Sequence, residues 1–153
     1  MKGIQDYYPD HFGQCYGCGR LNEQGYQLKT SWDGDETLSV FTPSEYHTAI
    51  PGSVYGGLLA SLIDCHGTGS AALALAKEKG IELKEYNAPR CVTGSLQVSY
   101  KKPTPIDSDL EIRGVIKEVK GKKVTVDIRL FSKGEVRVTG EVIAIQVPDD
   151  FGK

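Results

Sequence analysis

The chain has 153 residues, a formal net charge of −2 and a pI near 5.9. This length suffices for one domain with a hydrophobic core, and no change of composition marks a second, so we expect residues 1–153 to form a single domain. The charge gives no general reason to expect nucleic acid or an anionic membrane as a partner. No run of about 18 apolar residues and no secretory signal is evident, so we expect no membrane span and a cytoplasmic location.

Residues 1–25, the lead-in, are predicted to be rich in loops. Within them Cys15 and Cys18 have the spacing of half a zinc knuckle. A second half is missing, because Cys65 and Cys91 look isolated in a predicted helix and a predicted strand. Without an export signal we expect reduced thiols. We therefore favour a structural turn at Cys15–Cys18 and expect no metal, with a metal or redox role as the less favoured alternative.

After the lead-in, residues 26–32 and 37–41 are predicted to be two short strands joined by a tight turn at Asp33-Gly34-Asp35. From about Tyr55 to Lys79 the apolar run is too long for a strand and predicts one helix, capped by Gly80. This helix is apolar nearly all round, so we expect protein to surround it. Gly67 and Gly69 each cost about 1 kcal/mol there, which indicates close approach by a sheet or a partner helix.

From Arg90 onward, apolar residues alternate with a period of two, which predicts four antiparallel strands. Lys120-Gly121 and Lys133-Gly134 are expected hairpin turns, while Pro103 and Pro105 keep one connection out of the sheet. A sheet of this size can curl around a single helix and bury it. The predicted class is α+β, an antiparallel sheet wrapped around one long central helix.

The candidate site begins at Tyr55-Gly56-Gly57, where the helix starts. Unpaired N–H groups and the positive dipole end of a helix can receive a carbonyl or an oxyanion there. Asp64 is the single acid in the apolar stretch that follows, and a carboxylate in such a place is a candidate for chemistry. Two plainer interpretations stay open: the glycines are only a tight junction, or Asp64 is a structural ion-pair partner.

The order of elements is itself distinctive when it is combined with three local motifs. These are the Gly-Gly pair, Leu-x-Asp ending at Asp64, and the sequence Val-Ser-Tyr-Lys-Lys-Pro at residues 98–103. Together they resemble the hotdog-fold thioesterase superfamily, and most closely the PaaI-like acyl-CoA thioesterases. Cys18-Gly19 and Asn22 before Gly25 resemble a lead-in found in one branch of that family.

The resemblance implies hydrolysis of an acyl-coenzyme A thioester to free acid and CoA, without a metal or other cofactor. Gly57 would give its N–H to the thioester carbonyl as an oxyanion hole. Asp64 would act as nucleophile or as general base on water. Thr93 would complete the catalytic set, with a hydroxyl that helps to position the water.

The expected substrate-binding residues surround this set: Tyr55, Gly56, Ser61, Lys101 and Lys102. Tyr55 stands where relatives usually carry His; a phenol can donate a hydrogen bond but does not titrate near neutrality. Lys101 and Lys102 either keep a sheet edge soluble or meet the phosphates of coenzyme A. His47 and His66 are expected to be structural, and His66 lies about 200° round the helix from Asp64.

A dimer follows from helix geometry as well as from the resemblance, which implies a homodimer or a dimer of dimers with sites at subunit interfaces. Asp64 follows Gly57 by seven positions, which is about 10 Å along the axis. Two antiparallel helices about a two-fold axis would bring Gly57 of one chain toward Asp64 of the other. The alternative function is a non-catalytic module that binds acyl-CoA or another small ligand and has lost turnover with the usual His.

Overall fold

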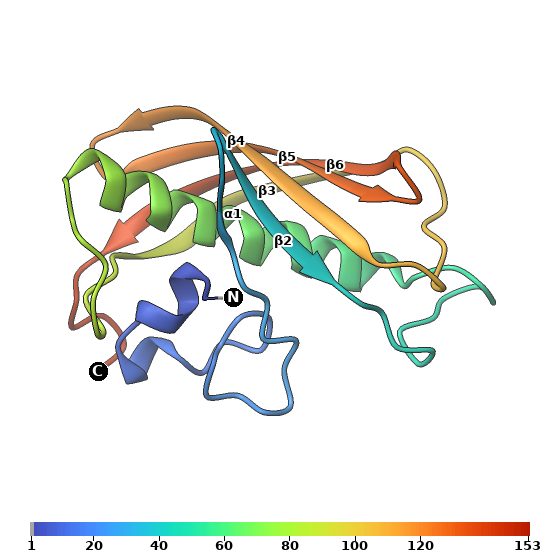
Figure 1. Ribbon diagram of the computed structural model, residues 1–153, viewed down its shortest axis with the longest axis horizontal. Coiled ribbons are helices and arrows are strands. Elements are labelled where there is room, and N and C mark those ends of the chain that lie inside the picture. The colour runs from blue at the N-terminus through green and yellow to red at the C-terminus, as the bar shows by residue number, and fades with distance from the viewer. Residues whose placement is uncertain (1) are drawn as a thin grey trace.

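A computed structural model describes residues 2–153 and contains one long helix and one sheet (Figure 1). The sheet has six antiparallel strands in the order β1-β2-β4-β5-β6-β3. The elements in chain order are the 3₁₀ turns η1 (Ile4–Tyr7) and η2 (Asp10–Phe12), β1 (Ser31–Asp33), β2 (Glu36–Phe41), α1 (Gly56–Glu78), β3 (Arg90–Tyr100), β4 (Leu110–Lys120), β5 (Lys123–Ser132) and β6 (Glu135–Val147). The predicted α+β class is confirmed.

The limits of α1 agree with the sequence. Tyr55 is the N-cap residue and the helix runs from Gly56 to Glu78. Gly80 adopts a φ of 64°, and the N–H of Ile81 donates to the carbonyl of Ala76 at 2.8 Å. This is the left-handed glycine cap that commonly ends a helix.

The first predicted strand is wrong over most of its length, because only its end belongs to β1. Gln27 has a φ of 52°, which interrupts extended backbone. The N–H groups of Tyr26 and Leu28 donate to the carbonyls of Tyr16 and Gly17 at 3.0 and 3.1 Å. This segment therefore pairs with the lead-in instead of the sheet.

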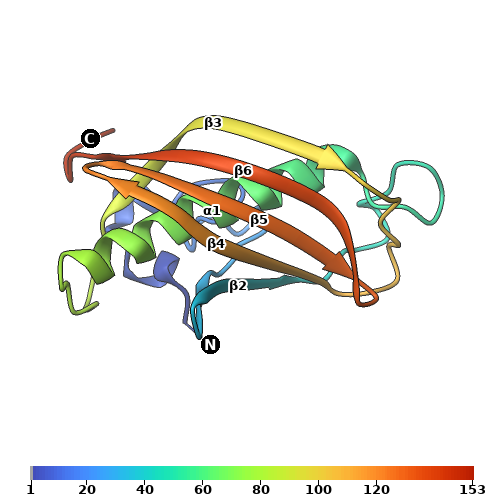
Figure 2. The ribbon, with the colours of Figure 1, turned by 90° about the horizontal axis from the view of Figure 1, so that it is seen from above.

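The strand after α1 lies at the edge of the sheet. β3 pairs with β6, the last strand of the chain, and not with β4, which follows it in sequence (Figure 2). The two predicted hairpin turns are present, with positive φ at Gly121, Lys133 and Gly134. Along β3 the register shifts between Thr93 and Ser95, a bulge that re-aims the neighbouring side chains.

α1 is buried from two sides, which explains its apolarity. The sheet covers one side, and the lead-in covers part of the other, where Ile4 and Tyr8 pack with Ala72 and Leu73 (Figure 1). By length and composition α1 could span a membrane, but its most apolar stretch is 83% buried within the protein. Before Lys77, the residues of α1 that are only partly buried form one stripe, here called the open stripe: Gly56, Gly57, Ala60, Ser61 and Asp64.

The two glycines within α1 mark close contacts, as expected. A Cβ at Gly67 would lie 2.4 Å from Cγ2 of Val142 on β6, and one at Gly69 would lie 2.7 Å from Nε2 of Gln5 in the lead-in. These contacts hold the helix against the sheet and the lead-in at once. The direction of Asp64 is thereby fixed relative to both.

His66 anchors α1 to β2 from inside the core. Its Nδ1 lies 2.7 Å from Oγ of Ser39 and its Nε2 lies 3.0 Å from Oγ1 of Thr37. Burial lowers the pKa of His66 to about 3, so the ring is neutral at ordinary pH. The ring faces the sheet, away from the open stripe, and this confirms the structural interpretation.

Candidate active site

The open stripe carries both halves of the predicted site. Gly57 and Asp64 lie on the same side of α1 because residues three and four apart share one helix face. Their separation is about 10 Å along the axis. Since the stripe is only partly buried by residues 2–153 of one chain, a substrate or a second chain can reach both residues.

At the start of α1 the main chain offers free donors. Within residues 2–153 no acceptor is found for the N–H groups of Gly56 or Gly57, and Tyr55 makes no side-chain cap. The hydroxyl of Tyr100, at the end of β3, donates to the carbonyl of Gly56 at 2.7 Å and fixes the first turn. Tyr100 was not among the predicted site residues, because its place in an alternating strand gave no signal of this bond.

Asp64 is held from β3. The hydroxyl of Thr93 donates a hydrogen bond to Oδ1 of Asp64, so Thr93 contacts the acid itself. Asp64 is half-buried and has no Lys or Arg partner in the described part of the chain. The alternative of a structural ion pair therefore finds no support, and Oδ2 is available to water or substrate.

Tyr55 lies beside the glycines. Its side chain is 57% exposed, and a Cβ at Gly57 would lie 2.5 Å from Cε2 and 2.7 Å from Oη of Tyr55. The phenol thus lies over the helix start, where its hydroxyl can donate to a bound carbonyl. Ser61 is less available, since its hydroxyl donates to the carbonyl of Gly57 at 2.9 Å.

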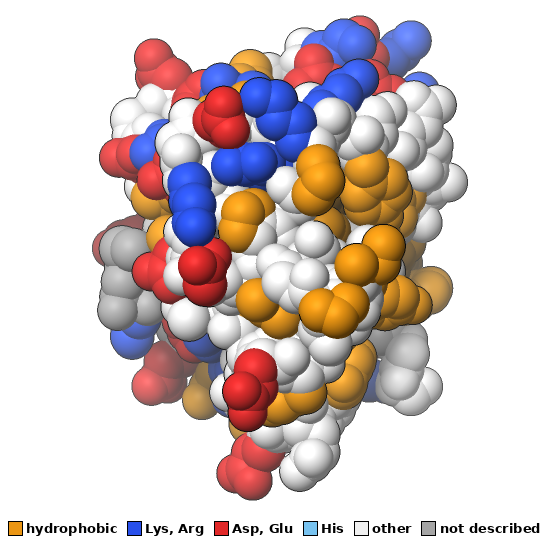
Figure 3. Space-filling view, turned by 90° about the vertical axis from the view of Figure 1, so that its right-hand side faces the viewer, with side chains coloured by type: hydrophobic (Ala, Val, Ile, Leu, Met, Phe, Trp, Pro, Cys, Tyr) orange, Lys and Arg blue, Asp and Glu red, His pale blue; other side chains and the backbone are white. Residues whose placement is uncertain are grey.

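A hollow of about 320 Å³ adjoins the first turn of α1 and includes Gly56, Tyr100, Lys101 and Lys102 in its lining. Lys102 pairs with Glu135 at 3.1 Å, whereas Lys101 has no acidic partner within residues 2–153. At this end of the molecule hydrophobic side chains gather below a group of Lys and Arg side chains (Figure 3). The surface suits a ligand with an apolar part and an anionic part.

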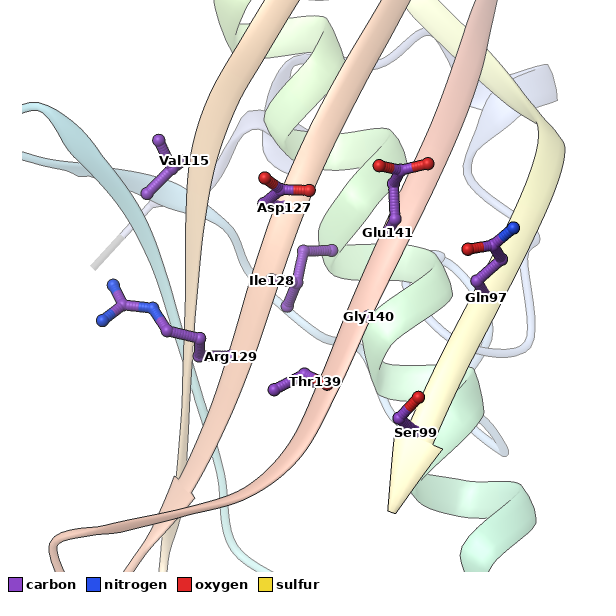
Figure 4. A pocket seen from close by; sticks show the side chains of 9 residues that line it. All are labelled: Gln97, Ser99, Val115, Asp127, Ile128, Arg129, Thr139, Gly140 and Glu141. Carbon is purple, nitrogen blue, oxygen red and sulfur yellow. The ribbon is translucent and has the colours of Figure 1, made fainter. Parts of the chain in front are cut away.

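A second hollow, of about 370 Å³, lies elsewhere, on the outer face of the sheet. Figure 4 shows the side chains of Asp127, Glu141 and Gln97 in a row across β5, β6 and β3. None of the predicted site residues lines it, and its acidic side chains do not suit an anionic ligand. We therefore assign the candidate site to the open stripe and not to this larger hollow.

The cysteines do not lie as expected. Cys65 is not isolated, because its Sγ lies 3.9 Å from Sγ of Cys15, and Cys18 lies in the same cluster. Hydrogen bonds from Cys18 and Cys65 hold the pKa of Cys15 well below its usual range, and the bond to Cys15 raises the pKa of Cys18 to about 12. Sequence spacing could not reveal this cluster, since 46 residues separate Cys65 from Cys18 in the chain.

A family model described as the thioesterase superfamily matches residues 51–139, more than half of the chain. The chain belongs to the thioesterase superfamily. The matched residues include α1 with Gly57 and Asp64, and β3 with Thr93. The expected membership is therefore confirmed over the segment that carries the candidate site.

Two solved structures share the fold. A thioesterase superfamily protein from Shewanella loihica PV-4 is 44% identical, with a TM-score of 0.66, and the match covers 83% of this chain and 96% of that one. The PaaI protein of E. coli, from the phenylacetic acid degradation operon, is 12% identical, with a TM-score of 0.64 and coverage of 80% and 81%. The predicted hotdog fold is confirmed. Because the identity to PaaI is low, that similarity concerns the fold alone.

One curated relative carries a named activity. Acyl-coenzyme A thioesterase THEM4 of Mus musculus is 27% identical over 114 residues, which are 74% of this chain but 44% of the mouse protein. The match thus spans less than half the length of that relative. Membership of the superfamily supports thioester chemistry in general. It does not identify the substrate or the roles of single residues.

Proposed function

We propose that this protein hydrolyses an acyl-CoA thioester to the free acid and CoA. The observation that carries the proposal is the open stripe. At one end it presents N–H groups that have no acceptor within the described residues 2–153, and at the other the carboxylate of Asp64, oriented by Thr93. Membership of the thioesterase superfamily and the likeness to a mouse acyl-coenzyme A thioesterase support the same reaction.

In the proposed reaction the N–H of Gly57 donates to the thioester carbonyl oxygen and stabilises negative charge as it develops there. Asp64 either takes a proton from water as the water attacks, or attacks the carbonyl carbon itself. In both routes the C–S bond breaks and the CoA thiolate leaves and takes up a proton; after direct attack, water hydrolyses the resulting acyl-aspartyl anhydride. Thr93 keeps Oδ1 of Asp64 in place. Tyr55 donates to the bound thioester in place of the usual histidine.

The two halves of one such site come from two chains. Because Gly57 and Asp64 of one chain lie about 10 Å apart along α1, one carbonyl group cannot contact both. Two open stripes packed antiparallel bring them together. The exposed edge of β3, which carries Val92, Leu96 and Tyr100, also needs cover, since a long apolar edge otherwise aggregates. We infer a homodimer, alone or as a dimer of dimers.

The coenzyme A portion is assigned to the hollow beside the first turn of α1. Lys101 is exposed there and has no acidic partner among residues 2–153, whereas Lys102 already pairs with Glu135. Lys101 is therefore the better candidate for a phosphate contact.

The test is release of free thiol from a panel of short, long and aromatic acyl-CoAs. Asp64→Asn should lower kcat by more than about 100-fold, at the level expected for loss of an acid–base group. Asp127→Asn, on the outer face of the sheet, is the matched control and should keep the parent rate. An Asp64→Asn dimer that hydrolyses its best substrate at the parent rate rejects the proposal.

A second function is favoured by the phenol at position 55, namely binding of acyl-CoA without turnover. In that case acyl-CoAs raise the melting temperature while no free thiol appears. The same panel, read by thermal shift beside thiol release, separates the two functions.

A further inference from the structure

Three cysteine side chains meet between the lead-in and α1. The Sγ atoms of Cys15, Cys18 and Cys65 all lie within 4.8 Å of one another, and all three thiols are free. Cys91, also buried and free, lies outside this group. The hydrolytic reaction uses none of these thiols, so the cluster requires its own explanation.

The spacing of the sulfur atoms suits a metal ion. A tetrahedral zinc site with Zn–S bonds of about 2.3 Å separates its sulfur atoms by about 3.8 Å. Between Cys15 and Cys65 the distance is 3.9 Å. A disulfide needs about 2 Å and would use only two of the three thiols. One ion can engage all three with little movement.

The backbone around Cys15 forms a tight turn, in which the carbonyl of Cys15 accepts the N–H of Gly19 at 2.7 Å. A Cβ at position 17 would lie 2.3 Å from Sγ of Cys65, so only glycine allows the turn to approach α1 this closely. The local chain thus supports the group of three sulfur atoms.

The charge next to the cluster also fits. Arg90 is partly buried, its guanidinium lies 5.0 Å from the ring of Tyr8, and it has no carboxylate partner in the described part of the chain. Arg90 and Cys15 line the same hollow. Three thiolates and a divalent cation carry a net charge of −1, which Arg90 neutralises. This accounts for a partly buried cation that has no carboxylate partner within residues 2–153.

We propose that Cys15, Cys18 and Cys65 bind one thiophilic divalent metal ion, with Zn²⁺ as the expected occupant. The fourth position belongs to water, which enters through a hollow of about 230 Å³ that borders Cys15 and Arg90. The ion joins the lead-in to α1 at the residue that follows Asp64. The proposed hydrolysis does not use this ion.

Cobalt provides the test, because Co²⁺ occupies zinc–thiolate sites and gives strong sulfur-to-metal absorption bands. Reduced protein, freed of metal with a chelator and kept without oxygen, is titrated with Co²⁺. We expect saturation at one equivalent per chain, with the visible bands of tetrahedral Co²⁺, and displacement by Zn²⁺. Bound Zn²⁺ should also raise the melting temperature, since the ion binds the folded state.

Variants locate the ligands. Cys15→Ser and Cys65→Ser should each weaken Co²⁺ binding by more than about 10-fold. Loss of a residue that only contacts a metal ligand can already cost about 10-fold in affinity, so loss of a ligand should cost more. Cys91→Ser is the matched control and should bind Co²⁺ as the parent does. Cys15 is partly exposed, so Cys15→Ser keeps the test valid if Cys65→Ser does not fold. Absence of the sulfur-to-cobalt bands in the reduced parent, or equal binding by Cys15→Ser, overturns the proposal.

Discussion

Thr93 on β3 donates a hydrogen bond from its hydroxyl to Oδ1 of Asp64 on α1. This bond joins the edge strand of the sheet to the acid of the open stripe, beside the bulge that interrupts β3. It leaves Oδ2 as the atom that can receive a proton or attack a carbonyl. Thr93 therefore holds Asp64 in place, and the contact with water expected from the resemblance stays a prediction.

Removal of the Thr93 hydroxyl should slow the reaction without weakening substrate binding. A hydrogen bond to a charged group contributes about 1.5–3 kcal/mol, so Thr93→Val should lower kcat by about 10-fold to 100-fold and leave KM nearly unchanged. Thr93→Ser keeps the donor and should stay close to the parent. Equal rates for the Val and Ser variants would show that the bond has no role in turnover.

The side chain at position 55 should affect both the rate of hydrolysis and its pH dependence. Tyr55→His should raise kcat, because imidazole can polarise the thioester and also titrates near pH 6.5, so the variant's rate should acquire a pH dependence in that region. Tyr55→Phe removes the hydroxyl and should lower kcat. The parent, Phe and His enzymes are compared by thiol release from pH 5 to 9. Identical profiles for the Phe and His variants would contradict a polar role at position 55.

The two neighbouring lysines, Lys101 and Lys102, should differ in their contribution to acyl-CoA binding. Lys101→Ala should raise KM for an acyl-CoA by about 10-fold, the loss of one charge-assisted contact, and the effect should shrink in high salt. Lys102→Ala should change KM less, because Glu135 already engages that side chain. Acyl-pantetheine, which lacks the phosphates, is the control substrate, and with it both variants should match the parent. A KM rise for Lys101→Ala that persists with acyl-pantetheine would exclude a phosphate contact.

Acid should destabilise the protein through His66. Its folded pKa is about 3, below an ordinary value near 6.5, so the unfolded chain binds the proton more readily. The stability that this neutral ring contributes is present above pH 6.5 and is lost as pH falls toward 3, at about 1.4 kcal/mol per pH unit. Urea unfolding at pH 7, 6, 5 and 4 measures the slope. His66→Gln should be less stable at pH 7 but show a shallower decline.

Gly67 should be intolerant of a methyl group. Alanine improves helix propensity by about 1 kcal/mol, yet its Cβ would lie 2.4 Å from Cγ2 of Val142, and overpacking costs typically 1–3 kcal/mol. We expect Gly67→Ala to be destabilised in denaturant unfolding. Val142→Ala makes room, so the double variant should be more stable than the sum of the two single effects predicts. Strict additivity would argue against the contact.

Much of the fold could be predicted because local patterns determine it. The alternation of apolar residues with a period of two predicted β4, β5 and β6. The glycine after Lys79 predicted the end of α1, and the hairpin glycines predicted the turns. The strand prediction failed over residues 26–30 because these residues pair with the lead-in, and no local sequence pattern reveals that pairing. The sequence also did not reveal which strand pairs with β3, because the order of strands in the sheet depends on contacts between residues far apart in the chain.

The candidate site was partly predictable for the same reason. Helix periodicity alone places Gly57 and Asp64 on one face, and the structure agrees. The bonds made by Thr93 and Tyr100 depend on how β3 crosses α1, which one sequence does not specify. The three-thiol cluster required residues 15, 18 and 65 to converge through tertiary packing.

The open stripe consists of Gly56, Gly57, Ala60, Ser61 and Asp64, and four of these five side chains are small or absent. Narrow side chains let two helices approach to the short end of the usual 8–10 Å range. Under the proposed two-chain arrangement, the same atoms define both the width available to an acyl group and the fit between subunits. Selection for a bulkier substrate therefore cannot act on this stripe without also changing the tendency of the chains to associate.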